Sequence, residues 1–228
     1  MNRKRILVFG DSNSWGFVPC NANESTTRYD ALTRWPAVMA ARLGSGFELV
    51  EEGLSGRTTD LDDAQIDLPS AHLRGAVFNG AKILPALLAS HLPLDLVIIM
   101  LGTNDLKTRF KRNAREIAIA ALGLARLIAE CEGGVATSYP TPKVLLVAPP
   151  PVGTKFHDPA EWTDSHQKSL ELGPALRDRG RGEPPVSRCW EGDWDGRDRR
   201  HSFLCGSAKK ARRSRREESL AYFPGAVA

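Results

Sequence analysis

The 228-residue chain lacks any apolar run long enough to cross a membrane. A membrane-spanning helix needs about 20 predominantly apolar residues, and no stretch approaches that length. The N-terminus, MNRKRILVFG, has a basic start but only a short apolar run, and it leads straight into a motif. We therefore interpret it as a first strand rather than a signal peptide, and we expect no membrane partner.

Cysteine is scarce, and its spacing excludes a dense disulfide framework. The four cysteines contain no CxxC pair: Cys20, Cys131, Cys189 and Cys205. We therefore expect reduced thiols and a cytoplasmic location. There are no internal repeats, and a hydrophobic content of 42% with 25% charged residues is typical of a soluble globular protein. The length suits one sizeable core.

Charge is unevenly distributed along the chain. Residues 1–174 are almost neutral, whereas residues 175–228 hold 13 basic residues, 11 of them arginine, against 8 acidic ones. A basic tail is typical of binding to nucleic acid or an anionic surface. A non-catalytic protein whose tail grips nucleic acid is therefore one alternative. We do not expect nucleic acid as a partner, however, because a shifted reading frame would explain the same arginines.

Short apolar runs alternate with helical patterns through residues 1–174. Buried strands are predicted at 5–9, 47–51, 94–101 and 143–148. Helices are predicted at 33–43, at 83–90 and from the capping box of Asn113 and Glu116 to about residue 130. Strands separated by helices imply an α/β fold in which a parallel sheet is covered on both faces. After about Pro174 no apolar periodicity remains, so we expect the residues beyond it to lack regular structure and to make few core contacts.

Three short motifs directly follow three of the predicted strands, at the edge where open parallel sheets bind ligands. They are Gly10-Asp11-Ser12-Asn13-Ser14, Gly53-Leu54-Ser55-Gly56-Arg57-Thr58-Thr59 and Gly102-Thr103-Asn104-Asp105. Each has an ordinary structural interpretation as well: a capping serine, a turn glycine and an asparagine in an Asx-turn. Their conjunction favours chemistry, because acyl transfer needs a nucleophile together with preorganised donors for the oxyanion.

The three blocks resemble those of the SGNH (GDSL-like) hydrolases, whose name lists Ser, Gly, Asn and His. The strings GDSNSWG, EEGLSGRTT and MLGTNDLK are most similar to the arylesterase-like branch. The resemblance implies a flavodoxin-like three-layer α/β/α sandwich. It assigns Ser12 as nucleophile and its backbone N–H as the first oxyanion donor. The Gly53 N–H would be the second donor and the Asn104 side chain the third.

The same resemblance implies hydrolysis of small carboxylic esters, with short acyl or aryl groups, through an acyl-serine intermediate. No metal or organic cofactor is implied, and the partner is a small-molecule ester. A relative acting on thioesters or acetylated sugars is the closest enzymatic alternative. The oligomeric state stays open, a homo-oligomer included.

Neighbouring residues have less definite roles. Trp15 either lines the acyl pocket or anchors its turn. We expect Asp11 and Asp105 to bond loop amides, and we interpret Arg57 as a solvated loop arginine.

The fourth family block, Asp-x-x-His, supplies the general base and the residue that orients it. Its spacing occurs in this chain only at Asp198-Arg199-Arg200-His201, where two arginines intervene and a charged run comes next. Asp198 and His201 are the candidates for these two roles, because nothing else in the chain can fill them.

A reading-frame shift accounts for the unusual setting of this block. The codons for DRRHSFLCGSAKKARRSRRE can be chosen so that the shifted frame reads IDGIHFSADQQKKLGEAVA, with DGIH followed by a helical pattern. We therefore interpret residues 1–174 as the hydrolase core and residues 175–228 as an out-of-frame tail. This tail would replace the family's last strand, Asp-x-x-His block and helix, with activity impaired as a result.

Overall fold

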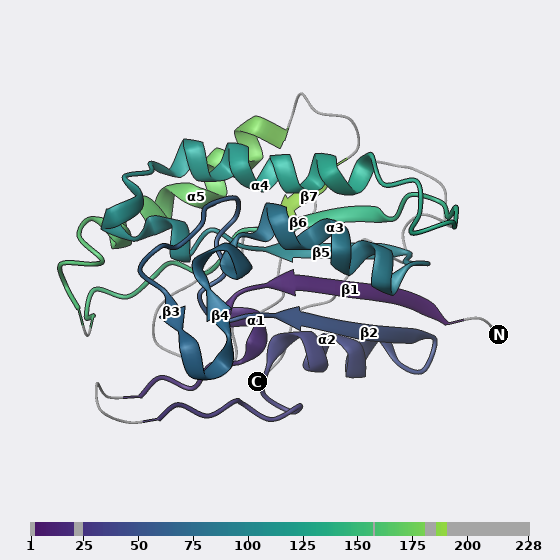
Figure 1. Cartoon of the computed structure of the whole chain (residues 1–228), viewed down its shortest axis with the longest axis horizontal. Helices are drawn as coiled ribbons and strands as arrows, with labels where there is room; N and C mark the ends of the chain where they lie inside the picture. The colour runs from purple at the N-terminus through teal and green to yellow at the C-terminus, as the bar shows by residue number, and fades with distance from the viewer. Residues whose placement is uncertain (1–2, 21–24, 157, 181–185, 191–228) are drawn as a thin grey trace, which may run out of the picture.

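The computed structural model describes residues 3–20, 25–156, 158–180 and 186–190, the last range by its backbone alone. Within this part a five-stranded parallel sheet has the order β2-β1-β5-β6-β7 (Figure 1). The strands are β1 (Lys4–Gly10), β2 (Phe47–Gly53), β5 (Leu96–Met100), β6 (Lys143–Val147) and β7 (Val186–Trp190). Counting parallel strands alone, this is the 2-1-3-4-5 order of flavodoxin-like folds.

Helices cover both faces of the sheet and make the structure a three-layer α/β/α sandwich (Figure 1). The longer helices are α2 (Trp35–Leu43), α3 (Gly80–His91), α4 (Ala114–Ala129) and α5 (Ser165–Gly180). Shorter elements are α1 (Ser12–Trp15), the hairpin of β3 (Asp67–Leu68) and β4 (Leu73–Arg74), and the 3₁₀ helices η1 (Pro69–Ala71), η2 (Gly75–Phe78), η3 (Asn104–Leu106) and η4 (Thr108–Phe110). The predicted fold class is confirmed.

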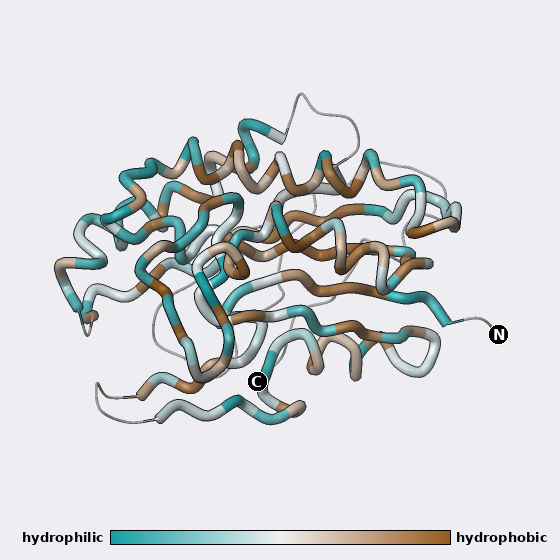
Figure 2. Tube along the Cα trace, viewed as in Figure 1, coloured by the Kyte–Doolittle hydropathy of each residue, from teal (hydrophilic) through white to brown (hydrophobic). Residues whose placement is uncertain are grey.

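The apolar residues of β1 divide between the two faces. Leu7 and Phe9 are fully buried in a core formed with α3 and α4, whereas Ile6 and Val8 pack on the side of α2. Figure 2 shows β1 and β5 as largely hydrophobic stretches of the trace. This burial on both faces explains why the strand is a continuous apolar run rather than an alternating one.

The predicted helix starts have mixed outcomes. The capping box of α4 is present, because Asn113 Oδ1 accepts from Glu116 N–H and Glu116 Oε2 accepts from Asn113 N–H, each at 2.9 Å. Helix α2 begins two residues later than predicted, and its N-cap is Arg34 without a side-chain cap. None of the described helices combines the length and apolarity needed to span a membrane.

The chain just after Pro174 is better packed than predicted. Helix α5 continues to Gly180, its Leu176 is 2% exposed within the main core, and β7 pairs in parallel with β6. The expectation of few core contacts is therefore wrong for 175–180, and the expected loss of regular structure is wrong for the backbone of 186–190. Residues 191–228, with Asp198 and His201, lie outside the described residues.

Candidate active site

The nucleophile and amide motifs come directly after β1 and β5, which are neighbours in the sheet. From β1 the chain passes to β2 on one side and later to β5 on the other, so the strand order reverses between β1 and β5 (Figure 1). Open α/β sheets bind ligands outside the carboxyl ends of the strands at such a point. The fold therefore places Ser12 and Asn104 where a ligand site is expected.

Ser12 is the first residue of α1, a single helical turn that begins directly after β1. The Asp11 carboxylate caps this turn by accepting a hydrogen bond from the Asn13 N–H at 2.8 Å. The first N–H groups of a helix have no partner within it. Among the described residues, neither the N–H nor the hydroxyl of Ser12 has a hydrogen-bond partner, and the residue is partly exposed. Both groups are available to a ligand.

Two glycines let α1 lie directly against the strand ends. A Cβ at Gly10 would be 2.1 Å from Ser14 Oγ, and a Cβ at Gly53 would be 2.5 Å from the Trp15 backbone nitrogen. Any larger residue at either position would push α1, and with it Ser12, away from the sheet.

The place of Gly53 in β2 does not fit the predicted role of oxyanion donor. The next N–H along the chain, that of Leu54, donates to the Gly10 carbonyl at 3.1 Å. Successive N–H groups of a strand point to opposite sides, so the Gly53 N–H points away from β1. Since β2 is the edge strand of the described sheet, this N–H points off that edge. We therefore correct the assignment of Gly53 from donor to close-packing residue.

Sequence reasoning missed Gly56, which lies three residues further on. Arg57 N–H donates to Leu54 O at 3.1 Å and closes a four-residue turn in which Gly56 has φ +91°. A glycine at the third position is the signature of a type II turn, and this signal was present in the sequence. The Gly56 N–H has no hydrogen-bond partner within the described part of the chain.

Asn104 opens the 3₁₀ helix η3 and is 5% exposed. Its Nδ2 donates to the Arg57 carbonyl at 3.0 Å. An amide nitrogen carries two hydrogens, so one anchors the side chain and the other remains for a ligand. The loop of Asn104 is also joined to the turn of Ser12, because Asn13 Nδ2 donates to Thr103 Oγ1 at 3.1 Å.

Two buried carboxyls support these loops. Asp105 accepts hydrogen bonds from the Thr59 N–H at 3.0 Å and from the Thr59 hydroxyl, as expected for a residue that holds loop amides. Burial is the main cause that raises the pKa of Asp105 to about 6, and the same cause raises the pKa of Asp11 to about 6.

Trp15 is used as a turn anchor. Its carbonyl accepts from Arg28 Nε at 2.6 Å, and the Arg28 guanidinium carbon lies 5.6 Å from the centroid of its ring. Its backbone also packs on Gly53. A place for Trp15 in the acyl pocket stays a prediction.

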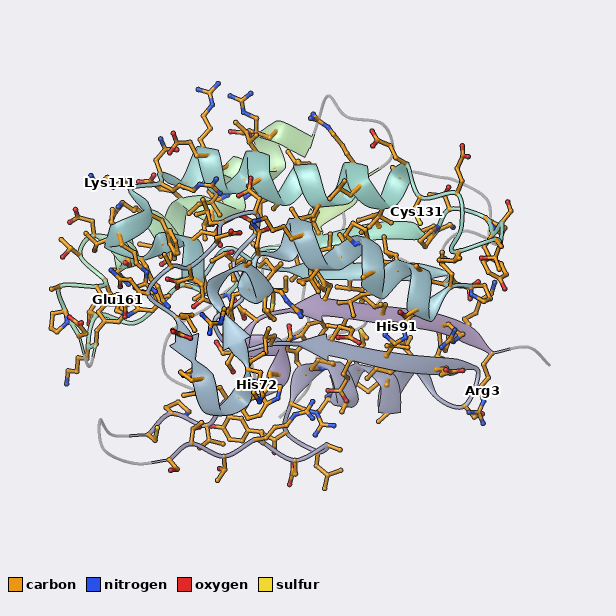
Figure 3. The ribbon with its side chains drawn as sticks, viewed as in Figure 1. Arg3, His72, His91, Lys111, Cys131 and Glu161 are labelled. Carbon is orange, nitrogen blue, oxygen red and sulfur yellow. The ribbon has the colours of Figure 1, made fainter. Side chains whose placement is uncertain are left out.

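An ion-pair cluster fixes the loop after β6 beside the loop after β5. The fully buried carboxylate of Asp63 accepts from Arg109 Nε at 3.0 Å, and Arg109 also pairs with Glu161. The Lys107 ammonium lies 3.8 Å from Glu161 and 5.7 Å from the Trp162 ring. Figure 3 shows Glu161 on the side of the molecule where the strands end. The cluster therefore holds the loop after β6 against the loop that contains Asn104.

Two of the described histidines, His91 and His166, bond within the fold through a ring nitrogen, and the third, His72, is exposed between η1 and β4. His91 Nε2 is 2.8 Å from Glu52, and the His91 carbonyl is bonded by Arg5 at the start of β1, towards the opposite end of the sheet (Figure 3). His166 Nδ1 lies 2.7 Å from Val152 O. The assignments of Asp198 and His201 are not tested by the described residues.

Comparisons with known proteins agree with this geometry. The model of the GDSL-like lipase/acylhydrolase family matches residues 8–178. A solved carbohydrate acetylesterase of Sinorhizobium meliloti, Est24, is 46% identical with a TM-score of 0.69, and the alignment covers 78% of this chain and 80% of that one. The comparison with curated proteins gave no match.

Two esterases called aryl esterases are also similar. The aryl esterase of M. smegmatis is 45% identical with a TM-score of 0.69, covering 78% of this chain and 79% of that one. A putative arylesterase of Agrobacterium tumefaciens is 33% identical with a TM-score of 0.62, covering 78% of each chain. The chain therefore belongs to the GDSL-like lipase/acylhydrolase family and is a carboxylic ester hydrolase of the SGNH type.

Proposed function

We propose that this hydrolase cleaves small carboxylic esters, with short acyl or aryl groups, through an acyl-Ser12 intermediate. One observation carries the proposal. At the ends of two adjacent strands of the described sheet lie a Ser12 hydroxyl without a hydrogen-bond partner and an Asn104 side-chain amide that uses only one of its two hydrogens. A nucleophile beside preorganised donors is the arrangement that acyl transfer requires.

In the first half of the reaction, Ser12 Oγ attacks the ester carbonyl carbon and its proton passes to a general base. The carbonyl oxygen becomes an oxyanion that three donors receive: the Ser12 N–H, the second amide hydrogen of Asn104 and the Gly56 N–H. Gly56 replaces Gly53 as the second donor, because its N–H is unpartnered among the described residues and it adjoins the Arg57 carbonyl that holds Asn104. The alcohol leaves with the base's proton, and water then releases the acid from Ser12.

We propose that the general base lies in the part of the chain outside the described residues. In the chain as it stands it is His201, oriented by Asp198; in the shifted frame it is the histidine of DGIH. Two observations support the frame interpretation. The family match ends at residue 178, and the apolar side chains of Leu145 and Val147 are only partly buried on the face of the sheet that α2 covers.

Small substrates are proposed because the loops around the strand ends are tied by ion pairs and carry no extended apolar lid in the described chain. A series of p-nitrophenyl esters of increasing acyl length tests this, with the Ser12→Ala variant as the background control. We expect kcat/KM to be highest between acetate and butyrate. An optimum at octanoate or longer would contradict the proposal.

A carbohydrate acetylesterase is the second candidate, favoured by the similarity to Est24. Both candidates use the same site and differ in the alcohol that leaves. Rates measured side by side on phenyl acetate and on an acetylated xylose separate them, because a carbohydrate acetylesterase would prefer the sugar ester.

The cytoplasm is the location we propose, since the four cysteines of the sequence contain no CxxC pair and the described Cys131 is a reduced thiol, as a reducing compartment favours. Fractionation of cells that express the tagged chain, followed by immunoblotting, tests the location. Recovery outside the cytosolic fraction would contradict it.

A further inference from the structure

Arg57 is a buried arginine, although the sequence suggested a solvated loop residue. Only 3% of it is exposed, and its guanidinium carbon lies 4.3 Å from the centroid of the Phe9 ring in the core of the sheet. The interpretation as a surface residue is therefore wrong. The reason is that its partners, the ends of two strands, are brought together only by folding.

The guanidinium of Arg57 joins the carboxyl ends of β1 and β2. Its Nη1 donates to the Gly10 carbonyl at 2.9 Å and also to the Glu52 carbonyl. Gly10 is the last residue before Asp11 and Ser12, so this bond fixes the strand end from which the nucleophile turn begins.

The main chain of Arg57 contacts the oxyanion side of the same site. Its carbonyl accepts the hydrogen bond from Asn104 Nδ2 at 3.0 Å, and its N–H closes the turn that contains Gly56. One residue therefore bonds the strand end before Ser12, the amide of Asn104 and the turn of Gly56.

Burying the charge of Arg57 lowers the stability of the fold, which a residue with only a structural role would not need to do. Burial lowers the pKa of its guanidinium to about 10, which leaves it cationic at neutral pH. Its hydrogen bonds within the described chain are to carbonyls, and its buried Nε has no partner there. The carboxylates of Glu52 and Asp11 attract this charge, but no described ion pair includes Arg57. A buried charge without a direct ion pair is costly to a fold, whereas an apolar side chain of similar length would fill the same space at less cost.

We propose that Arg57 is a positioning residue for ester hydrolysis: it fixes the Ser12 turn through the Gly10 carbonyl and orients the Asn104 amide through its own carbonyl. The proposal rests on the proposed roles of Ser12 and Asn104. It assigns Arg57 no contact with the substrate, so its loss should slow the chemical step while substrate binding is largely kept.

The test compares Arg57→Met and Arg57→Lys with the parent chain. Arg57→Lys keeps the charge but has a shorter side chain without the rigid guanidinium plane that places Nη1 between the Gly10 and Glu52 carbonyls. Two quantities are measured: kcat and KM on p-nitrophenyl acetate, and the rate of Ser12 phosphorylation by paraoxon, followed by intact mass. We expect both rates to fall by about 10- to 100-fold, somewhat less than for direct loss of an oxyanion donor, with KM nearly unchanged. We expect Arg57→Lys to recover only part of the loss.

Arg34→Met is the matched control. Arg34 is also largely buried, but its hydrogen bonds go to Glu51 on β2 and to the Tyr29 carbonyl, and none goes to the Gly10 strand end or to the Asn104 loop. Its loss should lower the melting temperature and leave kcat unchanged. If Arg57→Met does not fold, the comparison is made with Arg57→Lys. The NMR signals of the Asn104 side-chain amide are then measured as well, and we expect them to shift between the parent and Arg57→Lys.

The outcomes separate the inference from the proposed function. If Ser12→Ala abolishes both reactions but a folded Arg57 variant keeps the parental kcat, the positioning role is overturned and the proposed function stands. If Ser12→Ala keeps the parental rates, the proposed function fails and the role of Arg57 fails with it.

Discussion

In the proposed mechanism the oxyanion donors come from three separate segments, and the Asn104 side chain is itself anchored by a hydrogen bond. One amide hydrogen is committed to Arg57 and the side chain is almost fully buried, so the remaining hydrogen is preorganised. We expect Asn104→Ala to lower kcat by about two to three orders of magnitude with little change in KM. Steady-state kinetics on p-nitrophenyl acetate check this. A raised KM with an unchanged kcat would make Asn104 a substrate-positioning residue instead.

Asp11 gives the folded chain a pH dependence opposite to that of most carboxylates. Its pKa is raised by burial to about 6 from an ordinary value of 3.8, so between these values the folded state binds a proton that the unfolded state releases. The stabilisation is complete below the unfolded pKa and is lost as the pH rises through the folded pKa. Asp11→Asn keeps a capping acceptor but cannot ionise. We therefore expect the free energy of unfolding of this variant to fall by about 2–3 kcal/mol less than that of the parent as the pH rises from acid to neutral.

Urea unfolding of the parent and of Asp11→Asn, at about pH 4.5 and about pH 7.5, measures the effect on stability as a function of pH. Asp67→Asn, the same substitution at an exposed position on β3, is the control. Equal pH dependence in the parent and in Asp11→Asn would show that the Asp11 carboxyl is not perturbed.

At the scale of elements, the contact of α1 with the strand ends depends on the absence of a side chain at Gly53. A methyl group there would meet the Trp15 backbone nitrogen, which cannot move without the whole turn. We expect Gly53→Ala to destabilise the fold by about 1–3 kcal/mol. Thermal and urea unfolding measure this, with Gly46→Ala as the control because a Cβ there meets nothing within 4 Å. Parental stability in Gly53→Ala would contradict the packing.

The elements that could be predicted from sequence are those with a long pattern. The strands β1, β5 and β6 are continuous apolar runs, and α4 has both an apolar face and a capping box. The turn α1 and the hairpin of β3 and β4 were missed, since elements of two to four residues are too short to show a period. Helix α5 was missed although it has 16 residues, because Pro174 lies inside it and its few apolar residues give a weak helical pattern.

The predicted site had the same limit. Ser12 and Asn104 could be found because each comes after a strand in a recognisable motif. The choice between Gly53 and Gly56 depends on which N–H groups the sheet register uses, and the sequence does not show the register. The burial of Arg57 likewise depends on carbonyls of two strands that meet only in the folded chain.

At the scale of the whole molecule, the frame interpretation predicts that full activity depends on the segment of the chain beyond β7. We expect a chain with the shifted frame restored to place the DGIH histidine beside the Ser12 hydroxyl and to add a helix over Leu145 and Val147. Its kcat/KM on p-nitrophenyl acetate should then rise sharply above that of the present chain, because a general base contributes about 10²- to 10⁴-fold. A crystal structure of the present chain with His201 about 3 Å from Ser12 Oγ, and Asp198 on its other nitrogen, would contradict the frame interpretation.

The central claim, that Ser12 is the nucleophile of an ester hydrolase, is tested most directly by covalent labelling. The parent chain, Ser12→Ala and Ser14→Ala are each treated with paraoxon, digested and analysed by mass spectrometry. Ser14 is the matched control, because its hydroxyl is buried and unpartnered in the described chain, two residues away on the same turn. We predict one diethylphosphoryl group on Ser12 in the parent and in Ser14→Ala, and none in Ser12→Ala. Equal labelling of Ser12→Ala, or labelling of another serine in the parent, would contradict the assignment.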